Sequence, residues 1–432
     1  MDTPANPSRR RTLGAHQLRP ESLMMGYGYD PGLSEGALKS PVFQTSSFIF
    51  KTAEEGKAFF ELAYGLRDKE PGEKPGLAYS RINNPNLQIL EERLALWEGA
   101  EASLVFSSGM AAVSTTLLTF LRAGDTLLWS EPAYGGTEYF IENVLPGLGI
   151  TPIGFTDHLD GRLQQQALDA VQAGARIGAI YVETPASPTN HLVDIATCAA
   201  AARQIGEATG RRPLVVVDNT WLGPLWQQAL EHGADLAVYS LTKCIGGHSD
   251  LVAGACMGPS EHIAQVRAMR TVLGSVPDPH TAWLVLRSLE TLKLRMTAAM
   301  KNAQQIADFL NDHPRISHVH HLGFVRRGDP RYEIFRRQCR AAGSTFSFEL
   351  NGGEAEAFQF LNRLWLIKLA ISFGGTESVI AHPATMTHAD LTDERQRELG
   401  ITPGMLRLSV GIEHPEDLVA DLAQALEETE AG

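Results

Sequence analysis

Cysteine is scarce in this sequence, with four thiols in 432 residues: Cys198, Cys244, Cys256 and Cys339. They form no CxxC pair, so their spacing argues against a zinc site, and their wide separation argues against a disulfide framework. Long apolar runs are missing as well. Since a membrane-spanning helix needs about 18 or more consecutive apolar residues, the sequence predicts no membrane span.

Positive charge is also in short supply. The chain has 37 Lys and Arg against 50 Asp and Glu, a net charge of −13, and a pI near 5.6. Nucleic-acid-binding proteins usually present a basic face, whereas the one basic run here, residues 9–11 (RRR), stands in a polar stretch. No apolar segment comes after that run, which argues against a signal peptide. We therefore expect neither a nucleic-acid partner nor a membrane partner.

The rest of the composition is that of an ordinary folded protein. Hydrophobic residues make up 44% of the chain and charged residues 20%, which excludes intrinsic disorder. The 40 glycines and 23 prolines have no fixed period, and no internal repeat is visible. At about 150 residues per domain, the length suggests two or three domains. Together these features predict a cytoplasmic enzyme.

The first 45 residues differ in texture from the rest of the chain. They contain five prolines and no clean hydrophobic period, so they predict an extended arm rather than a folded domain. Such an arm either packs on a partner subunit or stays loose, and the pattern does not choose between the two. Residues 67–76 (RDKEPGEKPG) predict a surface loop.

Beyond residue 84, short apolar strands alternate with helices. A helical period predicts a helix at 85–98 that Gly99 ends, and a small-residue turn after a strand at 102–106 opens a helix at 110–121. Further strands are expected at 126–129, 178–182, 214–217 and 236–239. Because these strands are continuously apolar, they predict a mainly parallel sheet with helices on both faces.

After about residue 290 the strict alternation ends. Helices are expected at 292–310 and 354–364, and strands at 317–320 and 344–349. This mixture predicts a smaller α+β domain.

One of the predicted strands ends in a carboxylate. In VVVDNT, Asp218 comes directly after the strand at 214–217, and ligands of α/β proteins bind at the carboxyl ends of strands. The alternative interpretation is structural, because Asp and Asn are also good helix N-caps.

A lysine comes after the next strand. In SLTKCIGGHSD, Lys243 is flanked by the hydroxyl groups of Ser240 and Thr242 and by a glycine pair. An apolar site disfavours the ammonium form and so makes the amine a nucleophile, while the hydroxyls suit a phosphate. The segment lacks the GxxxxGK[ST] pattern of a nucleotide-binding loop. A lysine in a surface turn is the alternative.

Two further turns add a candidate phosphate site and an aromatic ring to the carboxylate and the lysine. Ser108, Gly109 and Met110 link a strand to a helix, where free N–H groups and the helix dipole favour an anion. Tyr134 precedes a Gly-Gly turn and offers a ring for stacking. A lysine for an imine, a carboxylate for a pyridinium nitrogen, a phosphate cup and an aromatic ring together predict pyridoxal phosphate.

The order of the motifs resembles that of the Cys/Met-metabolism family of pyridoxal-phosphate enzymes, the group of cystathionine γ-synthase, cystathionine γ-lyase and methionine γ-lyase. The motifs are YSRINNP, SSGM, YGGT, ETPASP, VVDNT, SLTKCIGGHSD, HPATMTH and LRLSVGIE. The resemblance covers about residues 40–427. The set is specific, although no single motif would be.

The resemblance implies a fold and an assembly. The fold would be the aspartate-aminotransferase-like fold type I, with a mainly parallel seven-stranded sheet domain and a smaller α+β domain. We expect an arm at 1–75 that contacts a neighbouring subunit, a large cofactor-binding domain at 76–290 and a C-terminal domain at 291–432. The assembly would be a homotetramer, a dimer of dimers whose active sites are shared between subunits.

The resemblance also assigns roles to residues. Lys243 would bind the cofactor as an imine and move protons, Asp218 would pair with the pyridine nitrogen, and Tyr134 would stack on the ring and act as acid or base. The other expected cofactor ligands are Ser108, Gly109, Met110, Ser187, Thr220, Ser240 and Thr242, joined by Tyr79 and Arg81 of a neighbouring subunit. Arg407 would clamp the substrate carboxylate in a bidentate manner, with Ser372 and Ile371 beside it.

Three positions depart from the family pattern. Ile371 stands where the cystathionine enzymes typically carry glutamate, and this resembles methionine γ-lyase. Gly136 stands where methionine γ-lyases typically carry a cysteine, and Ser187 replaces an asparagine near the phenolic oxygen of the cofactor. The loop at 67–76 is also longer than usual.

The resemblance and its departures favour γ-elimination from a methionine-like amino acid, giving 2-oxobutanoate, ammonia and a thiol. One alternative is γ-replacement on an activated homoserine, as in cystathionine γ-synthase or O-acylhomoserine sulfhydrylase. Another is γ-lyase action on a different γ-heteroatom amino acid, such as canavanine. A non-catalytic relative is a further alternative, against which the intact Lys243, Asp218, Tyr134 and Arg407 argue.

No metal site is expected. His318, His320 and His321 stand close together in the sequence, but the period of a strand divides them between two faces. We expect these side chains to serve at the surface or in packing.

Overall fold

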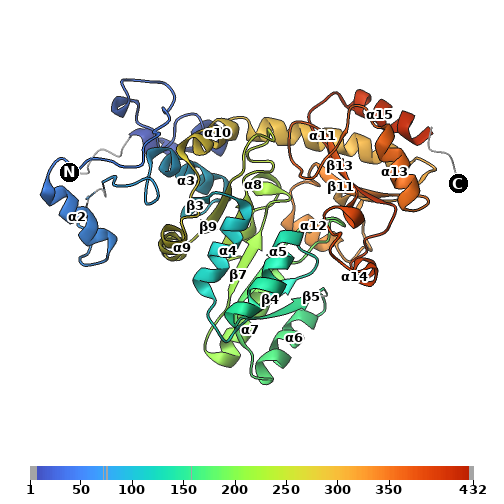
Figure 1. Ribbon diagram of the computed structural model, residues 1–432, viewed down its shortest axis with the longest axis horizontal. Coiled ribbons are helices and arrows are strands. Elements are labelled where there is room, and N and C mark those ends of the chain that lie inside the picture. Colours follow the sequence, from blue (N-terminus) through green and yellow to red (C-terminus); the bar gives the residue numbers. More distant parts are fainter. Residues whose placement is uncertain (1–6, 72, 74–75, 157, 428–432) are drawn as a thin grey trace.

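The computed structural model describes residues 7–71, 73, 76–156 and 158–427. The expected loop at 67–76 therefore lies partly outside the described residues, at positions 72, 74 and 75. Figure 1 shows three parts along the long axis: an N-terminal segment at one end, a large sheet in the middle and a smaller sheet at the C-terminal end.

A seven-stranded sheet, counted within the described residues, forms the middle of the molecule, in the order β3-β9-β8-β7-β6-β4-β5. Its strands are β3 (Ala102–Phe106), β4 (Asp125–Ser130), β5 (Thr151–Phe155), β6 (Arg176–Glu183), β7 (Leu214–Asp218), β8 (Leu236–Ser240) and β9 (Gly254–Gly258). Neighbouring strands are parallel except at β9, which runs antiparallel to both β3 and β8. The predicted mainly parallel sheet is confirmed.

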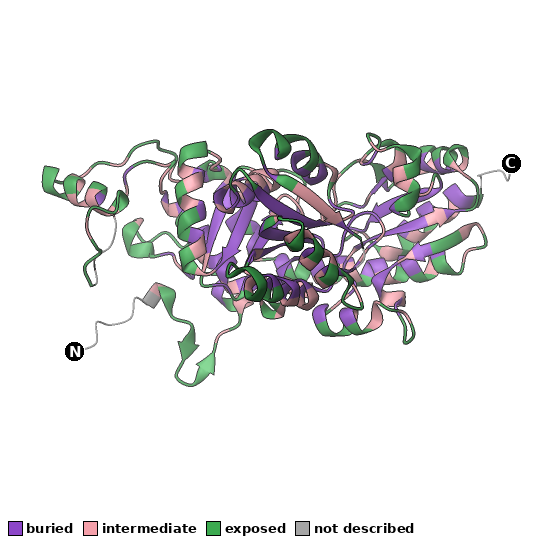
Figure 2. Cartoon of the chain, turned by 90° about the horizontal axis from the view of Figure 1, so that it is seen from below, coloured by how far each residue is buried: buried purple, intermediate pink, exposed green. Residues whose placement is uncertain are grey.

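Helices cover both faces of this sheet, as the continuous apolar strands predicted. Along β7, Val215 and Val217 pack in one core cluster and Val216 in another. The first cluster includes side chains of α3 (Pro85–Glu98), α7 (Ile195–Thr209) and α10 (Pro279–Leu289), and the second includes α4 (Gly109–Phe120) and α9 (Ser260–Leu273). Figure 2 shows the strands as the most continuously buried part of the chain.

Local signals set the ends of the helices next to the site. The Asn84 side chain accepts a hydrogen bond from Asn86 N and caps α3, which ends at Gly99 with a left-handed φ of 72°. Ser108 caps α4 in the same way by accepting from Ala111 N. These are the N-cap side chain and the terminal glycine that helices commonly use.

The C-terminal end holds a mixed sheet, in the order β10-β11-β14-β13-β12. Its strands are β10 (Ile316–His320), β11 (Thr345–Leu350), β12 (Lys368–Leu369), β13 (Val379–Ala381) and β14 (Met405–Ser409). Helices α11 (Leu292–Asn311), α13 (Glu354–Arg363) and α15 (Pro415–Glu427) pack on it with a core of their own. The long helix α11 leads from the middle of the molecule into this end (Figure 1).

The N-terminal segment is more structured than the sequence predicted. It contains β1 (Thr12–Leu13), β2 (His16–Gln17), α1 (Pro20–Leu23) and an unexpected helix, α2 (Ala53–Ala63). Thr52 caps α2 by accepting from Glu55 N, and the rings of Phe59 and Phe60 pack against Phe50. Most of the segment is exposed (Figure 2). Whether the boundaries expected near residues 75 and 290 divide folding units stays a prediction.

Further helices lie between these elements. They are α5 (Gly135–Tyr139), α6 (Arg162–Gln172), α8 (Gly223–Trp226), α12 (Tyr332–Gln338) and α14 (Asp393–Glu398). Over the described residues, no helix combines the length and the apolar character that crossing a bilayer would require.

Candidate active site

A cavity of about 460 Å³ lies at the carboxyl ends of the central strands, against the C-terminal sheet. Three carboxyl-end residues of neighbouring strands reach it: Glu183 of β6, Asp218 of β7 and Ser240 of β8. The predicted residues that line it are Ser108, Gly109, Met110, Tyr134, Ser187, Asp218, Thr220, Ser240, Thr242, Lys243, Ile371, Ser372 and Arg407. Segments from three distant regions of the chain therefore build one site, at the edge of the sheet where α/β proteins bind ligands.

Lys243 brings its amine into this cavity. Its Nζ donates to Ser372 Oγ at 2.9 Å and lies 5.0 Å from the centre of the Phe373 ring. Burial and the positive charge of Arg407 lower the pKa of Lys243 to about 8, against the opposing influence of Asp218. Desolvation disfavours the charged amine, as the apolar flanking strand predicted.

The Asp218 carboxylate is held by two donors. Thr220 N donates to Oδ1 at 3.0 Å, and the buried Tyr181 hydroxyl donates to Oδ2 at 3.2 Å. Burial raises the pKa of Asp218, while these hydrogen bonds and the charge of Lys243 act in the opposite direction. Thr220 Oγ1 also accepts from Ser240 N at 2.8 Å, which ties the end of β8 to the residues after β7.

The N-terminus of α4 forms an anion cup. In the described part of the chain, the N–H groups of Gly109 and Met110 have no hydrogen-bond acceptor. A Cβ on Gly109 would lie 2.7 Å from Ser240 Cβ, so only glycine lets the helix approach β8 this closely. The Thr242 hydroxyl donates to Ala253 O at 3.2 Å, so its proton is already engaged.

Arg407, on β14, lines the cavity from the C-terminal sheet. It is 5% exposed, and its guanidinium donates to Ser187 Oγ at 3.2 Å and to Ser372 O at 3.3 Å. Burial lowers the pKa of Arg407 to about 10, although Tyr134 and Glu183 oppose that shift. The guanidinium remains a cation near neutral pH and can receive a carboxylate.

Tyr134 stands at the rim with a 51% exposed side chain. Its backbone N–H donates to Glu183 Oε2 at 2.6 Å. A Cβ on Gly136 would lie 2.8 Å from Tyr134 Cε1 and 3.4 Å from Met110 Sδ. The ring position therefore depends on glycine at 136.

Several lining residues were not singled out from the sequence. The most buried charged one is Glu183, which pairs in register with Asp218 across β6 and β7. The rule about strand ends that selected Asp218 applies equally to Glu183, but it needs the strand order to place the two side by side. Other lining residues that were not singled out include three apolar side chains and one further carboxylate: Val252, Phe373, Met386 and Asp390.

Tyr79 and Arg81 do not line the cavity of their own chain. Arg81 Nη1 donates to Thr271 O at 2.5 Å, and its guanidinium carbon lies 5.8 Å from the centre of the Tyr79 ring. Both residues are exposed. Their expected role toward a neighbouring subunit stays a prediction.

The histidine group lies apart from the cavity. His318 is exposed, His320 Nε2 lies 2.7 Å from Glu349 Oε1, and the buried His321 ring packs 5.1 Å from the Phe346 ring. Surface and packing roles therefore account for all three. Within the described residues, no group of three or more His, Cys, Asp or Glu is arranged to hold a metal ion.

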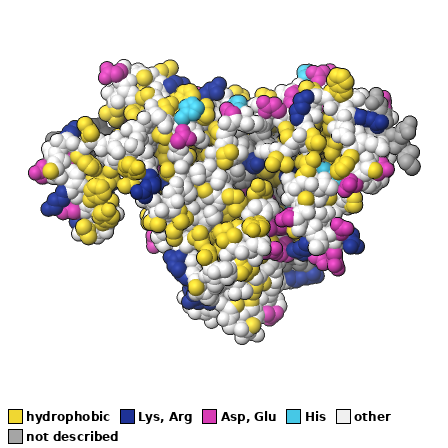
Figure 3. All heavy atoms as spheres, in the orientation of Figure 1, with side chains coloured by type: hydrophobic (Ala, Val, Ile, Leu, Met, Phe, Trp, Pro, Cys, Tyr) yellow, Lys and Arg dark blue, Asp and Glu magenta, His cyan; other side chains and the backbone are white. Residues whose placement is uncertain are grey.

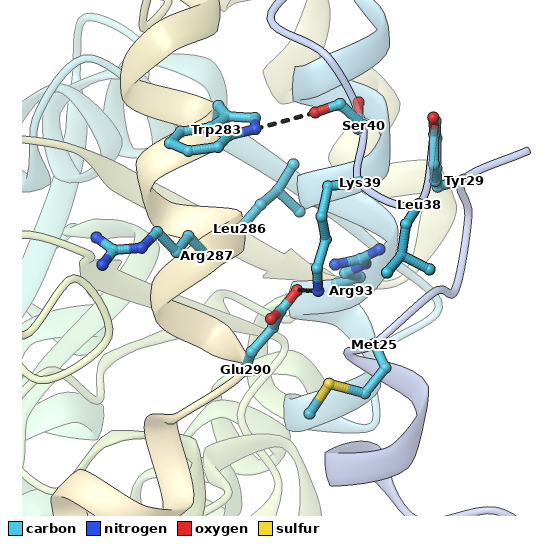
Figure 4. A pocket seen from close by; sticks show the side chains of 10 residues that line it. All are labelled: Met25, Tyr29, Leu38, Lys39, Ser40, Arg93, Trp283, Leu286, Arg287 and Glu290. Carbon is cyan, nitrogen blue, oxygen red and sulfur yellow. Dashed lines mark hydrogen bonds and ion pairs between the residues drawn. The ribbon is translucent and has the colours of Figure 1, made fainter. Parts of the chain in front are cut away.

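A second cavity, of about 320 Å³, lies between the N-terminal segment and α10 (Figure 4). Trp283 Nε1 donates to Ser40 O at 2.9 Å, and Lys39 forms an ion pair with Glu290 at 2.5 Å. It contains none of the predicted site residues.

The donors of the first cavity fit pyridoxal phosphate. Two free N–H groups at a helix N-terminus and the Ser240 hydroxyl suit the phosphate. Asp218 suits a protonated pyridine nitrogen, and Lys243 supplies an amine of lowered pKa for the aldehyde.

Comparison with known proteins agrees with this geometry. The family described as "Cys/Met metabolism PLP-dependent enzyme" matches residues 21–427. The chain is 41% identical over 402 residues to an L-methionine gamma-lyase of Pseudomonas putida, covering 93% of this chain and 95% of that protein. It is 34% identical to a cystathionine gamma-lyase of Bacillus subtilis, covering 95% of this chain and all of that protein.

The fold agrees as well. The crystal structure of a cystathionine gamma synthase from Xanthomonas oryzae pv. oryzae matches with a TM-score of 0.83 and 34% identity, covering 95% of this chain and 98% of that one. The predicted family, fold class and cofactor are thereby confirmed. The chain belongs to the Cys/Met metabolism family of pyridoxal-phosphate-dependent enzymes.

Proposed function

We propose that this enzyme is a γ-elimination lyase that releases 2-oxobutanoate, ammonia and a thiol from a methionine-like amino acid. The observation that carries this choice is Ile371, which is 67% exposed and lines the cavity next to Ser372. An apolar side chain there suits a thioether and offers no partner to the second charged amino-acid group of cystathionine. The 41% identity to a methionine γ-lyase supports the same choice.

Lys243 is the group proposed to move protons. A pKa of about 8 leaves part of the amine neutral near neutral pH, as a general base requires. Ser372 accepts from its Nζ and so keeps the amine inside the cavity. From this position one flexible side chain can take a proton first from the substrate Cα and later from Cβ. The second removal expels the γ-thiolate, which Tyr134 as acid would protonate.

The cofactor residues are proposed to hold the ring by its two ends. Gly109 N, Met110 N and the Ser240 hydroxyl would bind the phosphate, while Asp218 would face the pyridine nitrogen. Pyridoxal phosphate, when bound, supplies an electron sink for the charge that develops at the substrate Cα. Thr220 and Tyr181 orient the Asp218 carboxylate for this task.

Arg407 is proposed to bind the substrate carboxylate. Its guanidinium is buried, so the ion pair would form in an environment of low dielectric, where it is stronger than in water. Ser187 and Ser372 hold the guanidinium at two of its nitrogens. Ser187 thus contacts Arg407 directly, whereas the sequence interpretation assigned Ser187 to the cofactor alone.

A second substrate class has one observation in its favour. Asp390 lines the cavity, and no described residue forms a hydrogen bond or ion pair with its carboxylate. A carboxylate near the leaving group would suit a cationic γ-substituent, such as the guanidino-oxy group of canavanine. If this alternative is correct, Asp390→Asn lowers kcat/KM for canavanine and leaves that for methionine within about twofold.

We propose a homotetramer with shared active sites, in the cytoplasm. Exposed apolar side chains gather on the segment that carries α2 (Figure 3), among them Ile49 (96%), Tyr64 (72%) and Leu66 (73%). Such a patch is typical of a surface that another chain covers. The four cysteines are buried free thiols, which agrees with a reducing compartment.

The test is a product screen across methionine, homocysteine, cystathionine, O-acylhomoserines and canavanine, with 2-oxobutanoate and ammonia as readouts. We expect the highest kcat/KM with methionine. Ile371→Glu should shift the preference toward cystathionine, and Ile371→Leu is the matched control that keeps the wall apolar. Turnover of cystathionine alone would refute the proposal. With cysteine or sulfide added to the O-acylhomoserine reaction, formation of a γ-replacement product without 2-oxobutanoate would establish the γ-synthase alternative.

A further inference from the structure

Among the described residues that line the cavity, Glu183 is the buried carboxyl group that the proposed mechanism leaves without a role. It is the last residue of β6, is 7% exposed, and faces Asp218 in register on β7. A buried carboxyl group in an active site is costly unless it is hydrogen-bonded or protonated. Its contacts therefore indicate what it does.

Those contacts reach two functional turns. Glu183 Oε2 accepts from Tyr134 N at 2.6 Å, and Oε1 accepts from Ser187 N through a long bond of 3.5 Å. Ser187 Oγ in turn accepts from Arg407 at 3.2 Å. One side chain thus lies between the residue proposed as acid or base and the residue proposed to bind the substrate carboxylate.

We propose that Glu183 is a positioning residue that fixes Tyr134 and the Ser187–Arg407 pair relative to each other. This inference rests on the proposed function for what the substrate does at the site, but its geometric part holds for any amino-acid substrate. The distance between those two groups determines whether the substrate carboxylate and leaving group are engaged together. Displacements of about 1 Å in such positioning can cost about a hundredfold in rate.

The neighbours of Glu183 favour its neutral form. Burial and the charge of Asp218 raise the pKa of Glu183 to about 8, and the carboxyl group of Glu138 adds to this. Asp218 has Thr220, Tyr181 and Lys243 to stabilise its charge, so Glu183 is the member of the pair that keeps a proton. The other titratable or charged groups facing Glu183 are Arg407 on β14 and Tyr181 on β6.

Neutral Glu183 can be imitated by glutamine. Its amide carbonyl would still accept from Tyr134 N, whereas alanine would remove that acceptor. Above pH 8 the wild-type carboxyl group ionises beside Asp218, and glutamine does not. The pair of variants therefore separates the hydrogen bond from the charge.

The first experiment measures hydrogen exchange of the segment 131–140 in the cofactor-free protein, together with kcat and KM of the loaded enzyme. Glu183→Ala should speed exchange at Tyr134 by about tenfold or more and raise KM by about tenfold. Glu183→Gln should stay within about threefold of wild type in both the exchange rate and KM. Any fall in wild-type activity near pH 8 should be absent from this variant. Glu183→Asp, one methylene shorter, is the second variant if the alanine protein does not fold.

Glu98 provides the matched control. It is also a buried carboxyl group, and it accepts from Tyr239 and from Leu230 N outside the cavity. Glu98→Ala should lower the midpoint of unfolding without changing exchange in 131–140 or KM. If Glu183→Ala behaves like Glu98→Ala, the positioning role is wrong. If Glu183→Gln is as impaired as Glu183→Ala, the inference that Glu183 is neutral is wrong. If Glu183→Ala speeds exchange in 131–140 but the wild-type enzyme catalyses no γ-elimination, the positioning contact is supported and the proposed function is refuted.

Discussion

At the scale of single residues, both cations of the site meet at Ser372. Its Oγ accepts from Lys243 and its carbonyl oxygen accepts from Arg407. Ser372 has a φ of 97°, a backbone conformation that residues other than glycine rarely adopt. Strained backbone of this kind persists where the surroundings over-determine it, and it concentrates at functional sites.

Two substitutions at Ser372 separate the strain from the contact. Both Ser372→Ala and Ser372→Gly remove the Lys243 acceptor, so kcat should fall about tenfold in each. Glycine relieves the positive φ and alanine does not, so the glycine variant should be more stable than the alanine variant by about 1 kcal/mol. Urea unfolding measures this difference. An alanine variant at least as stable as the glycine variant would show that the positive φ stores no strain.

At the scale of elements, the phosphate cup depends on how closely α4 approaches β8. The contact is made where Gly109 meets Ser240, with 2.7 Å between an imagined Cβ and Ser240 Cβ. Because Ser240 Cβ is bonded to the backbone of a buried strand, it cannot easily move aside. The helix N-terminus and the hydroxyl it faces therefore hold a fixed separation.

Gly109→Ala should move α4 away from β8 and weaken cofactor binding. We expect a loss of affinity for pyridoxal phosphate of about tenfold or more, with a loss of about 1–3 kcal/mol in stability from overpacking. Gly147→Ala is the matched control, because a Cβ there meets nothing within 4 Å. Titration of the two cofactor-free variants with pyridoxal phosphate measures the effect. Equal affinities would show that the close approach is not needed.

The elements that could be predicted are those whose own residues carry the signal. Strands β6, β7 and β8 are buried on both faces, so their sequences are continuously apolar. Strand β5 contains Pro152 and Gly154 and is mostly half-buried, and β9 is bounded by glycines, so neither has that pattern. Helix α2 buries only Phe59 among its residues and lies outside the alternation of strands and helices from which the other elements were predicted.

The same logic applies to the site. Asp218 and Lys243 could be identified because Asp218 ends an apolar strand and Lys243 comes shortly after another. The roles of Glu183 and Ser187 depend on which strands are neighbours and on a contact 220 residues away, between Ser187 and Arg407. Neither the order of the strands nor this long-range contact can be read from the spacing of residues in the sequence. Asp390 and Met386 come from a loop whose course no local period describes.

At the scale of the whole molecule, the proposed shared site makes a prediction about mixed subunits. Lys243→Ala and Arg81→Ala chains should each be inactive alone. When co-assembled at random, half of the dimers are mixed, and each mixed dimer contains one site with wild-type Lys243 and a partner's wild-type Arg81. Activity should return to about a quarter of the wild-type value. Mixtures that stay inactive would show that each chain completes its own site.

Stability of the whole fold should also depend on pH through buried carboxyl groups. Burial raises the pKa of Glu98 from 4.5 to about 7. The unfolded chain loses this proton first as pH rises, so the stabilisation present below about pH 4.5 is lost between there and pH 7. The difference corresponds to about 3 kcal/mol.

Glu98→Gln removes this titration and keeps an acceptor for Tyr239. Urea unfolding at pH 5 and pH 8 should show a smaller loss of stability in the variant than in wild type. Parallel losses in the two proteins would mean that Glu98 is ionised throughout this range.

The most direct test of the central claim is to find which residue holds the cofactor. The loaded protein is reduced with borohydride and digested, and the peptides are mapped by mass spectrometry. We predict a pyridoxyl phosphate adduct on Lys243 alone, absent from Lys243→Ala together with the visible absorbance of the protein. An adduct on another lysine, or absorbance unchanged by Lys243→Ala, would contradict the assignment of Lys243.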